Sequence, residues 1–353
     1  MYIDICIRIG NMIMERNLKA VGLLNGSAGN VIFFYHLAKE TSEKKYLKYA
    51  NSLVDEIYKQ FNFNSDFQSG VAGTGWCLEY LIQNNFCKGN ANKILEDIDT
   101  KIFRTLYEQK EITLDLKTGF IGYLQYQMMR LKNKKNYKSD AAQINIELFK
   151  LIINKIDRLV PSQILNLTKD IKFNLLEDIY ILLWSFNDAF TLNIYSEKIL
   201  NMFRQWEIYL ISYLPSLHIN RLYLATVLLQ TNQILKSEKI NKHIRTLLHS
   251  IDCNQFESEI DLREINNVQF GYLGFLFILN RSIQVFDANY PNYQQLIDFK
   301  RKITNQYNNR LPDALNETKN TDKPQLNTKY GLAEGWAGVG LLLLLNPGMY
   351  EII

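Results

Sequence analysis

The stretch YGLAEGWAGVGLLLLL (330–345) places Gly335 and Gly338 three residues apart at the start of a long apolar run. Glycine is an unusual choice there, because it destabilises a helix interior relative to alanine. The same small-x-x-small spacing opens four more apolar segments, and five copies predict an internal repeat. These segments are GLLNGSAGNVIFFYHL (22–37), FQSGVAGTGWCLEYLI (67–82), LKTGFIGYLQYQMM (116–129) and VQFGYLGFLFIL (268–279).

Amphipathic segments lie between the glycine pairs. Apolar residues recur three or four apart in 45–61 and 91–109, and more weakly in 295–307. This spacing predicts helices with one polar face. The segments that follow the glycines are apolar on most sides, so they must be buried. The order therefore predicts two concentric layers of helices, with the apolar helices inside.

The distances between copies predict seven units. Intact motifs follow one another after 44 to 64 residues, and 152 residues separate Gly119 from Gly271. Two degenerate copies, 174–186 and 216–229, fill that gap. Seven hairpins that bend consistently can close into a ring, so we expect a single all-α domain over 1–353, an α/α toroid. The units open near Gly26, Gly70, Gly119, Glu177, Asn220, Gly271 and Gly335.

The glycine pairs have a predicted role in packing. Residues at i and i+3 lie on one face of a helix. We expect the missing Cβ atoms to let neighbouring inner helices approach closely where they converge on the ring.

Composition and charge are those of an ordinary soluble chain. Hydrophobic residues make up 47%, charged residues 22%, and the net charge is +4. A net charge this small gives no indication of nucleic-acid binding. The basic stretch 130–140 is interpreted as a solvated loop. The longest apolar run is far short of the ~18 residues of a membrane span. With four scattered cysteines and no signal-peptide pattern, we expect a cytoplasmic protein without a transmembrane segment.

The glycine motifs resemble the lanthionine synthetase C-like (LanC-like) family of lanthipeptide biosynthesis. The resemblance covers essentially residues 20–346 and rests on LLNGSAG, FQSGVAG, DLKTGFIG, QFGYLG and LAEGWAG. It implies a seven-repeat α/α toroid in a bacterial, cytoplasmic protein. It also implies a precursor peptide as the binding partner, with a dehydratase or another peptide-modifying enzyme as a candidate second partner.

The resemblance also implies where a zinc ion would bind. Cyclising members hold zinc near the centre of the ring, where it activates a peptide cysteine for addition to a dehydroamino acid. Their C-H-G motif falls here on Gln269 and Phe270, and the cysteine of the preceding repeat falls near His218. A register one repeat later gives Ala333 and Glu334 in the C-H slots. Neither set supplies zinc ligands, so we expect no bound metal.

Three residues are candidate catalytic groups: Asp115, His218 and Glu177. Asp115 stands four before Gly119, where the family has an aspartate next to its active site, although a capping role for the following helix is the simpler interpretation. Glu177 and the adjacent Asp178 stand in the repeat where the family has a histidine acid/base. Adjacent helix residues point to different faces, so these two cannot form a pair by themselves.

Four residues are candidate substrate-binding groups: Gln269, Phe270, Glu334 and Trp336. The first two occupy the ligand slots, and Trp336 is expected near the mouth of the ring. Glu334 has the alternative of capping a helix, and Trp336 that of filling the core.

Three functions remain open from the sequence. The first is a zinc-less pseudo-cyclase that binds a peptide for other maturation enzymes. The second is a metal-independent cyclase, since addition of a thiol needs only a base and a stabilised enolate. The third is a glycosidase-type enzyme, which needs two carboxylates ~5–10 Å apart across a cleft. A fold by itself does not choose among them.

Overall fold

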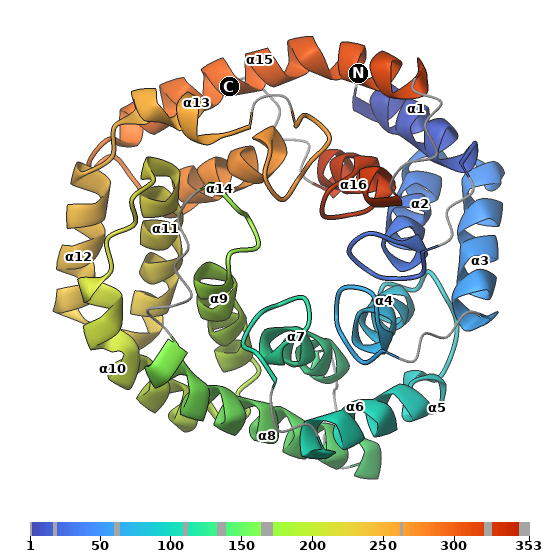
Figure 1. Cartoon of the computed structure of the whole chain (residues 1–353), viewed down its shortest axis with the longest axis horizontal. Coiled ribbons are helices and arrows are strands. Elements are labelled where there is room, and N and C mark those ends of the chain that lie inside the picture. Colours follow the sequence, from blue (N-terminus) through green and yellow to red (C-terminus); the bar gives the residue numbers. More distant parts are fainter. Residues whose placement is uncertain are drawn as a thin grey trace.

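A computed structural model describes residues 2–16, 20–59, 64–108, 112–132, 139–163, 172–261, 264–320 and 327–345. None of these residues lies in a strand, and their helices form two concentric rings (Figure 1). The predicted all-α toroid of seven hairpins is therefore confirmed. Most of the basic stretch 130–140 lies outside the described residues. No helix in the described part of the chain is long and apolar enough to cross a membrane.

The inner ring consists of the helices that follow the glycine motifs and their two degenerate copies. Most of their residues are buried, as expected for helices that are apolar on most sides. In order, they are α2 (Ser27–Thr41), α4 (Val71–Gln83), α7 (Phe120–Leu131), α9 (Asp178–Thr191), α11 (His218–Leu235), α14 (Tyr272–Val285) and α16 (Trp336–Leu345).

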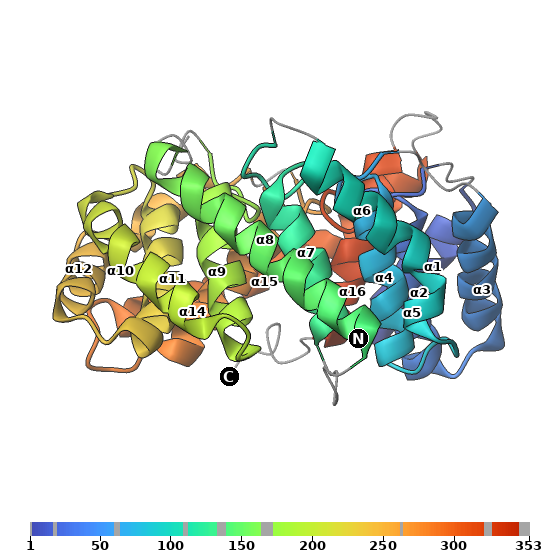
Figure 2. The same ribbon diagram turned by 90° about the horizontal axis from the view of Figure 1, so that it is seen from below.

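The outer ring consists of the amphipathic helices, which bury one face against the inner ring. In α12, for example, only Ile240, Ile244, Leu247 and Leu248 are buried. Edge-on, α3 and α12 lie at opposite sides of the ring (Figure 2). The outer helices are α1 (Tyr2–Met14), α3 (Lys44–Lys59), α5 (Ala91–Ile94) with α6 (Glu96–Glu108), α8 (Asp140–Gln163), α10 (Ser196–Ser212), α12 (Glu238–His249) and α15 (Tyr293–Asn320).

Short helical segments complete the connections: η2 (Cys253–Gln255), α13 (Phe256–Glu259) and η3 (Asn327–Tyr330). The ring closes where the N-terminal α1 packs on the C-terminal α16, which in turn packs on α2 (Figure 1). The thiol of Cys6 in α1 donates to the carbonyl oxygen of Gly340 in α16. This seam joins the two ends of the repeat array, so no end of the array is left to be capped.

The glycine pairs act differently from the expectation that they bring inner helices together. The second glycine of each pair lies against a side chain from the loop that precedes a neighbouring inner helix. A Cβ at Gly73 would lie 2.8 Å from the Leu23 Cβ, and one at Gly122 would lie 2.6 Å from the Phe67 Cβ. The same contact joins Leu332 to Gly29, Leu175 to Gly274 and Val268 to Gly338.

The opening glycines are the last residues before their helices, and their backbone is extended rather than left-handed. A Cβ would collide with the loop that precedes the helix, 2.5 Å from the Asn64 carbonyl oxygen at Gly70 and 2.3 Å from that of Thr113 at Gly119. Both glycines of a pair therefore pack loops onto the helix starts.

The loops before the inner helices form a layer of their own, which we call the loop tier: residues 20–26, 64–70, 113–119, 173–177, 264–271 and 330–335. Backbone hydrogen bonds join most of these loops to the next, and between 113–119 and repeat four the Leu116 backbone N donates instead to the Asp178 side chain. They run from Leu24 N to Gln68 O, Gln68 N to Lys117 O, Leu175 N to Gln269 O, Gln269 N to Ala333 O and Ala333 N to Leu24 O. The bond from Leu175 joins repeats four and six directly, so the loop of repeat five stands outside this ring of bonds.

The degenerate repeats begin close to their predicted positions. Glu177 is the residue before α9, as predicted. However, α11 begins at His218 with Leu217 in the place of the opening glycine, so Asn220 lies inside the helix rather than at its opening. Without a glycine in 216–229, the sequence could not fix this register.

Candidate functional site in the loop tier

Asp115 closes the turn that leads into α7. Its Oδ1 accepts hydrogen bonds from the Thr118 backbone N (2.7 Å) and from the Thr118 hydroxyl. Asp66 does the same for the turn before α4, accepting from Ser69 N and Gly70 N, and Asn267 accepts from Phe270 N before α14. The turn role of Asp115 is thus shared by three repeats, which matches the capping interpretation.

Asp178 faces Asp115 from the first turn of α9. The Leu116 backbone N donates to Asp178 Oδ1 at 3.4 Å, which places the second carboxylate against the loop of the first. Burial, reinforced by the negative charge of Asp115, raises the pKa of Asp178 from 3.8 to about 6. Such a carboxyl group can both accept and donate a proton near neutral pH.

Lys117 adds a positive charge to this group. Its Nζ lies 3.8 Å from the Glu334 carboxylate of the last repeat, and its charge lowers the pKa of Asp178, against the larger effect of burial. Both partners are about a third exposed. Glu334 is therefore tied to the loop of repeat three, and Lys117 interacts with two carboxylates, Glu334 and Asp178.

Gln269 lies where the loops of repeats four, six and seven meet. Its side chain is buried, and its Nε2 donates to Asn174 Oδ1 at 2.9 Å. Its Oε1 is buried without a hydrogen-bond partner among the described residues. Phe270 is half-buried beside it. Gln269 thus fixes the loops to one another through its backbone and its side chain.

Glu177 points away from the carboxylate pair. Its Oε2 accepts from Asn174 Nδ2 at 3.2 Å, and burial, reinforced by the charge of Glu177, raises the pKa of Tyr223 in α11. The adjacent Asp178, and not Glu177, therefore stands beside Asp115. This matches the expectation that two neighbouring acids point to different faces.

His218 contacts a different part of the molecule. Its Nδ1 accepts from the Asp252 backbone N at 3.0 Å, in the segment after α12. Arg221 lies 3.4 Å from the same nitrogen, and Glu259 caps the start of α11. The structure does not place His218 in contact with the loop-tier carboxylates.

Trp336 is fully buried at the start of α16, and its indole nitrogen has no hydrogen-bond partner among the described residues. It fills the core under the loop tier, so the expectation that it offers a face to a substrate is not supported. The physical reason is that the loops of neighbouring repeats cover the helix start where a mouth was expected.

Comparisons with known proteins agree with the fold. Residues 19–174 match the family model described as lanthionine synthetase C-like protein. The solved structure of a protein named nisin cyclase is 14% identical, with a TM-score of 0.59, and the match covers 94% of this chain and 89% of that one. The family match therefore covers less than half of this chain, and the likeness to the solved structure shows a shared fold along nearly all of it. A search of curated proteins gives no significant match.

The zinc slot implied by the family resemblance does not fit zinc in this chain. The slot contains an amide already bonded to Asn174 and the phenyl ring of Phe270, in place of a thiolate and an imidazole. His218 is the first residue of α11, and its Nδ1 already accepts a hydrogen bond from the Asp252 backbone N. The described residues contain no cluster of three His, Cys, Asp or Glu side chains suited to a metal ion.

Sequence reasoning missed two contacts of this site. Asp178 carries the most strongly raised carboxyl pKa, but only the folded loops reveal its neighbour Asp115. Lys117 stands two residues before Gly119 in an otherwise ordinary turn, and its pairing with Glu334 spans more than 200 residues of chain. Neither contact has a local sequence signal.

Proposed function

We propose that this chain is a zinc-independent, peptide-binding member of the LanC-like family that acts in lanthipeptide maturation. Its ligand is a precursor peptide, and its candidate protein partners are a dehydratase or another peptide-modifying enzyme. The observation that carries the proposal is the zinc slot: the toroid and its loop tier are intact, while Gln269 and Phe270 supply no zinc ligand.

The loop tier supports binding more strongly than turnover. The Asp115 carboxylate accepts hydrogen bonds within its own turn, and the side chains of Gln269 and Lys117 interact with neighbouring loops. These side chains hold the loops at the helix starts in a fixed arrangement. A rigid polar surface of this kind can bind a peptide without further reorganisation.

A metal-independent cyclase is the second candidate, and the pKa of Asp178 favours it. A carboxyl group with a pKa near 6 can remove a thiol proton or return one to an enolate. Without zinc the thiol keeps its ordinary acidity, so this reaction would be slower than one on a metal-bound thiolate.

A glycosidase has less support. In each of three cavities lined by described residues, a single carboxylate is found: Asp188, Asp55 and Glu147. Hydrolysis of a glycosidic bond needs two carboxylates at one cleft.

The test uses a synthetic peptide with one dehydroalanine and one free cysteine, labelled with a fluorophore. Anisotropy measures binding, and alkylation followed by mass spectrometry measures free thiol over time. We expect saturable binding and the same rate of thiol loss with and without the protein. Faster thiol loss that disappears in Asp178→Asn would establish the cyclase instead. If the peptide does not bind and its thiol is lost no faster with the protein, both proposals are contradicted.

A further inference from the structure

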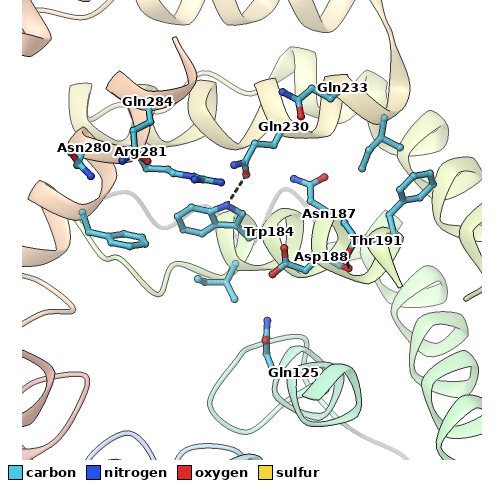
Figure 3. A pocket seen from close by; sticks show the side chains of 14 residues that line it. Gln125, Trp184, Asn187, Asp188, Thr191, Gln230, Gln233, Asn280, Arg281 and Gln284 are labelled. Atoms are coloured by element: carbon cyan, nitrogen blue, oxygen red, sulfur yellow. Dashed lines mark hydrogen bonds between the residues drawn. The ribbon is translucent and has the colours of Figure 1, made fainter. Parts of the chain in front are cut away.

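A cavity of about 560 Å³ lies among the inner helices α7, α9, α11 and α14 (Figure 3). It extends along α9 from Ile181 to Thr191, the last residue of that helix, and reaches Gln284 near the end of α14. It therefore lies toward the end of the inner ring opposite the loop tier. Its size falls in the range of about 300–1,000 Å³ that is typical of ligand pockets. We call it the inner cavity.

Side-chain amides dominate the polar lining of the inner cavity, and they come from four helices. They are Gln125, Asn187, Gln230, Gln233, Asn280 and Gln284. An amide side chain offers an N–H donor and a C=O acceptor, the same pair that each peptide group carries. Apolar and aromatic side chains of α9, α11 and α14 complete the wall.

Three of these amides are held in place by one hydrogen bond each. Gln125 donates to Ser185 (2.7 Å), Gln230 accepts from the Trp184 indole N–H (2.7 Å), and Asn280 accepts from Lys300 (3.0 Å).

In each of these three side-chain amides, the second polar atom has no hydrogen-bond partner among the described residues. The cavity therefore presents one amide oxygen, from Gln125, and two amide NH₂ groups, from Gln230 and Asn280. Groups oriented in this way bind a ligand without first losing rotamer freedom.

Asn187 has no hydrogen bond within the described part of the chain. Its side chain is 7% exposed, and both Oδ1 and Nδ2 are buried without a partner. It rises from α9 beside Gln230 in the wall of the cavity (Figure 3). A buried amide left unpaired destabilises the fold, so its presence at a cavity wall indicates a ligand that completes its bonding.

The charges of the inner cavity are one cation and one anion on facing helices. The guanidinium of Arg281, on α14, is exposed and makes no ion pair with a described carboxylate within 4 Å, and it extends toward Gln230 (Figure 3). Asp188, on α9, has its pKa raised by burial, while Lys132 and Arg281 act in the opposite direction. Arg281 is thus available for a carboxylate of the ligand.

We propose that the inner cavity is a second peptide site, which binds a short segment whose backbone pairs with the amides and whose carboxylate pairs with Arg281. The inference deepens the proposed function, because it takes the ligand to be a peptide. A sugar is the less good match, because the Trp184 indole N–H is bound to Gln230 and its ring meets Tyr223 and Phe277 edge-on.

The experiment is affinity selection with mass-spectrometric readout on the full chain. The probes are a pooled library of N-acetylated tetrapeptides with free carboxylates, the same library with amidated C-termini, and the neutral tetrasaccharides maltotetraose and chitotetraose. We expect retention of a subset of the free-carboxylate library and a loss of about tenfold to a hundredfold in Arg281→Gln. Arg204→Gln, on the exposed face of α10, is the matched control and should bind as the parent does.

A second variant separates binding from folding. Asn187→Leu removes the unpaired amide, so we expect unchanged or higher stability together with weaker retention of the same peptides. Equal retention by the parent, Arg281→Gln and Asn187→Leu would overturn the inference. So would retention of tetrasaccharides alone, or of no probe at all.

A loop-tier variant distinguishes this inference from the proposed function. Asp115→Asn with Asp178→Asn should leave tetrapeptide retention unchanged, because both residues lie outside the inner cavity. If the dehydroalanine peptide binds but no tetrapeptide is retained through Arg281, the inner cavity fails while the proposed function stands.

Discussion

Replacing Asp178 by asparagine should stabilise the protein at neutral pH and have little effect in acid. Burial and the charge of Asp115 raise the pKa of Asp178 from 3.8 to about 6, so the folded state disfavours the ionised carboxylate. The stability that this group contributes is fully present below pH 3.8, where both states are protonated. It is lost as the pH rises through about 6.

The size of the effect follows from the two pKa values. A change from 3.8 to about 6 corresponds to about 3 kcal/mol of lost stability above pH 7. Solvent reaches part of the side chain and screens the charges, which reduces the expected gain in Asp178→Asn to about 1–2 kcal/mol. Asn keeps the acceptor for the Leu116 N–H, so the loop contact remains.

The assay is urea unfolding of the parent and the variant at several pH values from 4 to 8, with the free energy of unfolding as the readout. The gain should grow between about pH 4 and pH 6 and level off above that range. Asp97→Asn, on the exposed face of α6, is the control for loss of one negative charge. A gain in Asp178→Asn that is the same at pH 4 and pH 8 would refute the reasoning.

Three further predictions concern the fold. Arg130→Met should lower the free energy of unfolding in urea by about 3–5 kcal/mol, because it leaves Glu79 and Asp99 without their ion-pair partner. Their carboxylates lie 2.5 and 2.7 Å from the buried guanidinium. Gly122→Ala should lower the melting temperature, against the usual gain for such a change in a helix, because its Cβ would overlap a neighbouring loop at a cost of about 1–3 kcal/mol. Cys87, half-buried, should be the first thiol alkylated in the native protein, and equal labelling of all four would contradict this. The three thiols expected to be slower are buried, with their pKa values raised by burial: Cys6, Cys77 and Cys253.

The repeat architecture could be predicted from the sequence because its signal is local and repeated. Each intact glycine pair stands at the start of an inner helix, and the amphipathic segments between them form the outer ring. The purpose of the glycines could not be predicted, because it depends on a loop of another repeat. Phe67, for example, lies 55 residues before the Gly122 that it covers.

The candidate site could be predicted only in part. Asp115 and Glu334 do lie in the loop tier, but the partner that matters to each of them, Asp178 and Lys117, comes from another repeat. The placement of His218 depended on a register that no glycine marked. The amides of the inner cavity are spread over four helices and share no sequence pattern, so only the folded ring brings them together.

The most direct test of the account is the metal content of the untagged protein, purified without chelator and measured by elemental analysis. Because Gln269 and Phe270 occupy the slot, we expect far less than one zinc ion per chain in a protein with a normal helical spectrum. A stoichiometric zinc that survives dialysis would contradict the account and make the cyclase reaction the leading function of this chain.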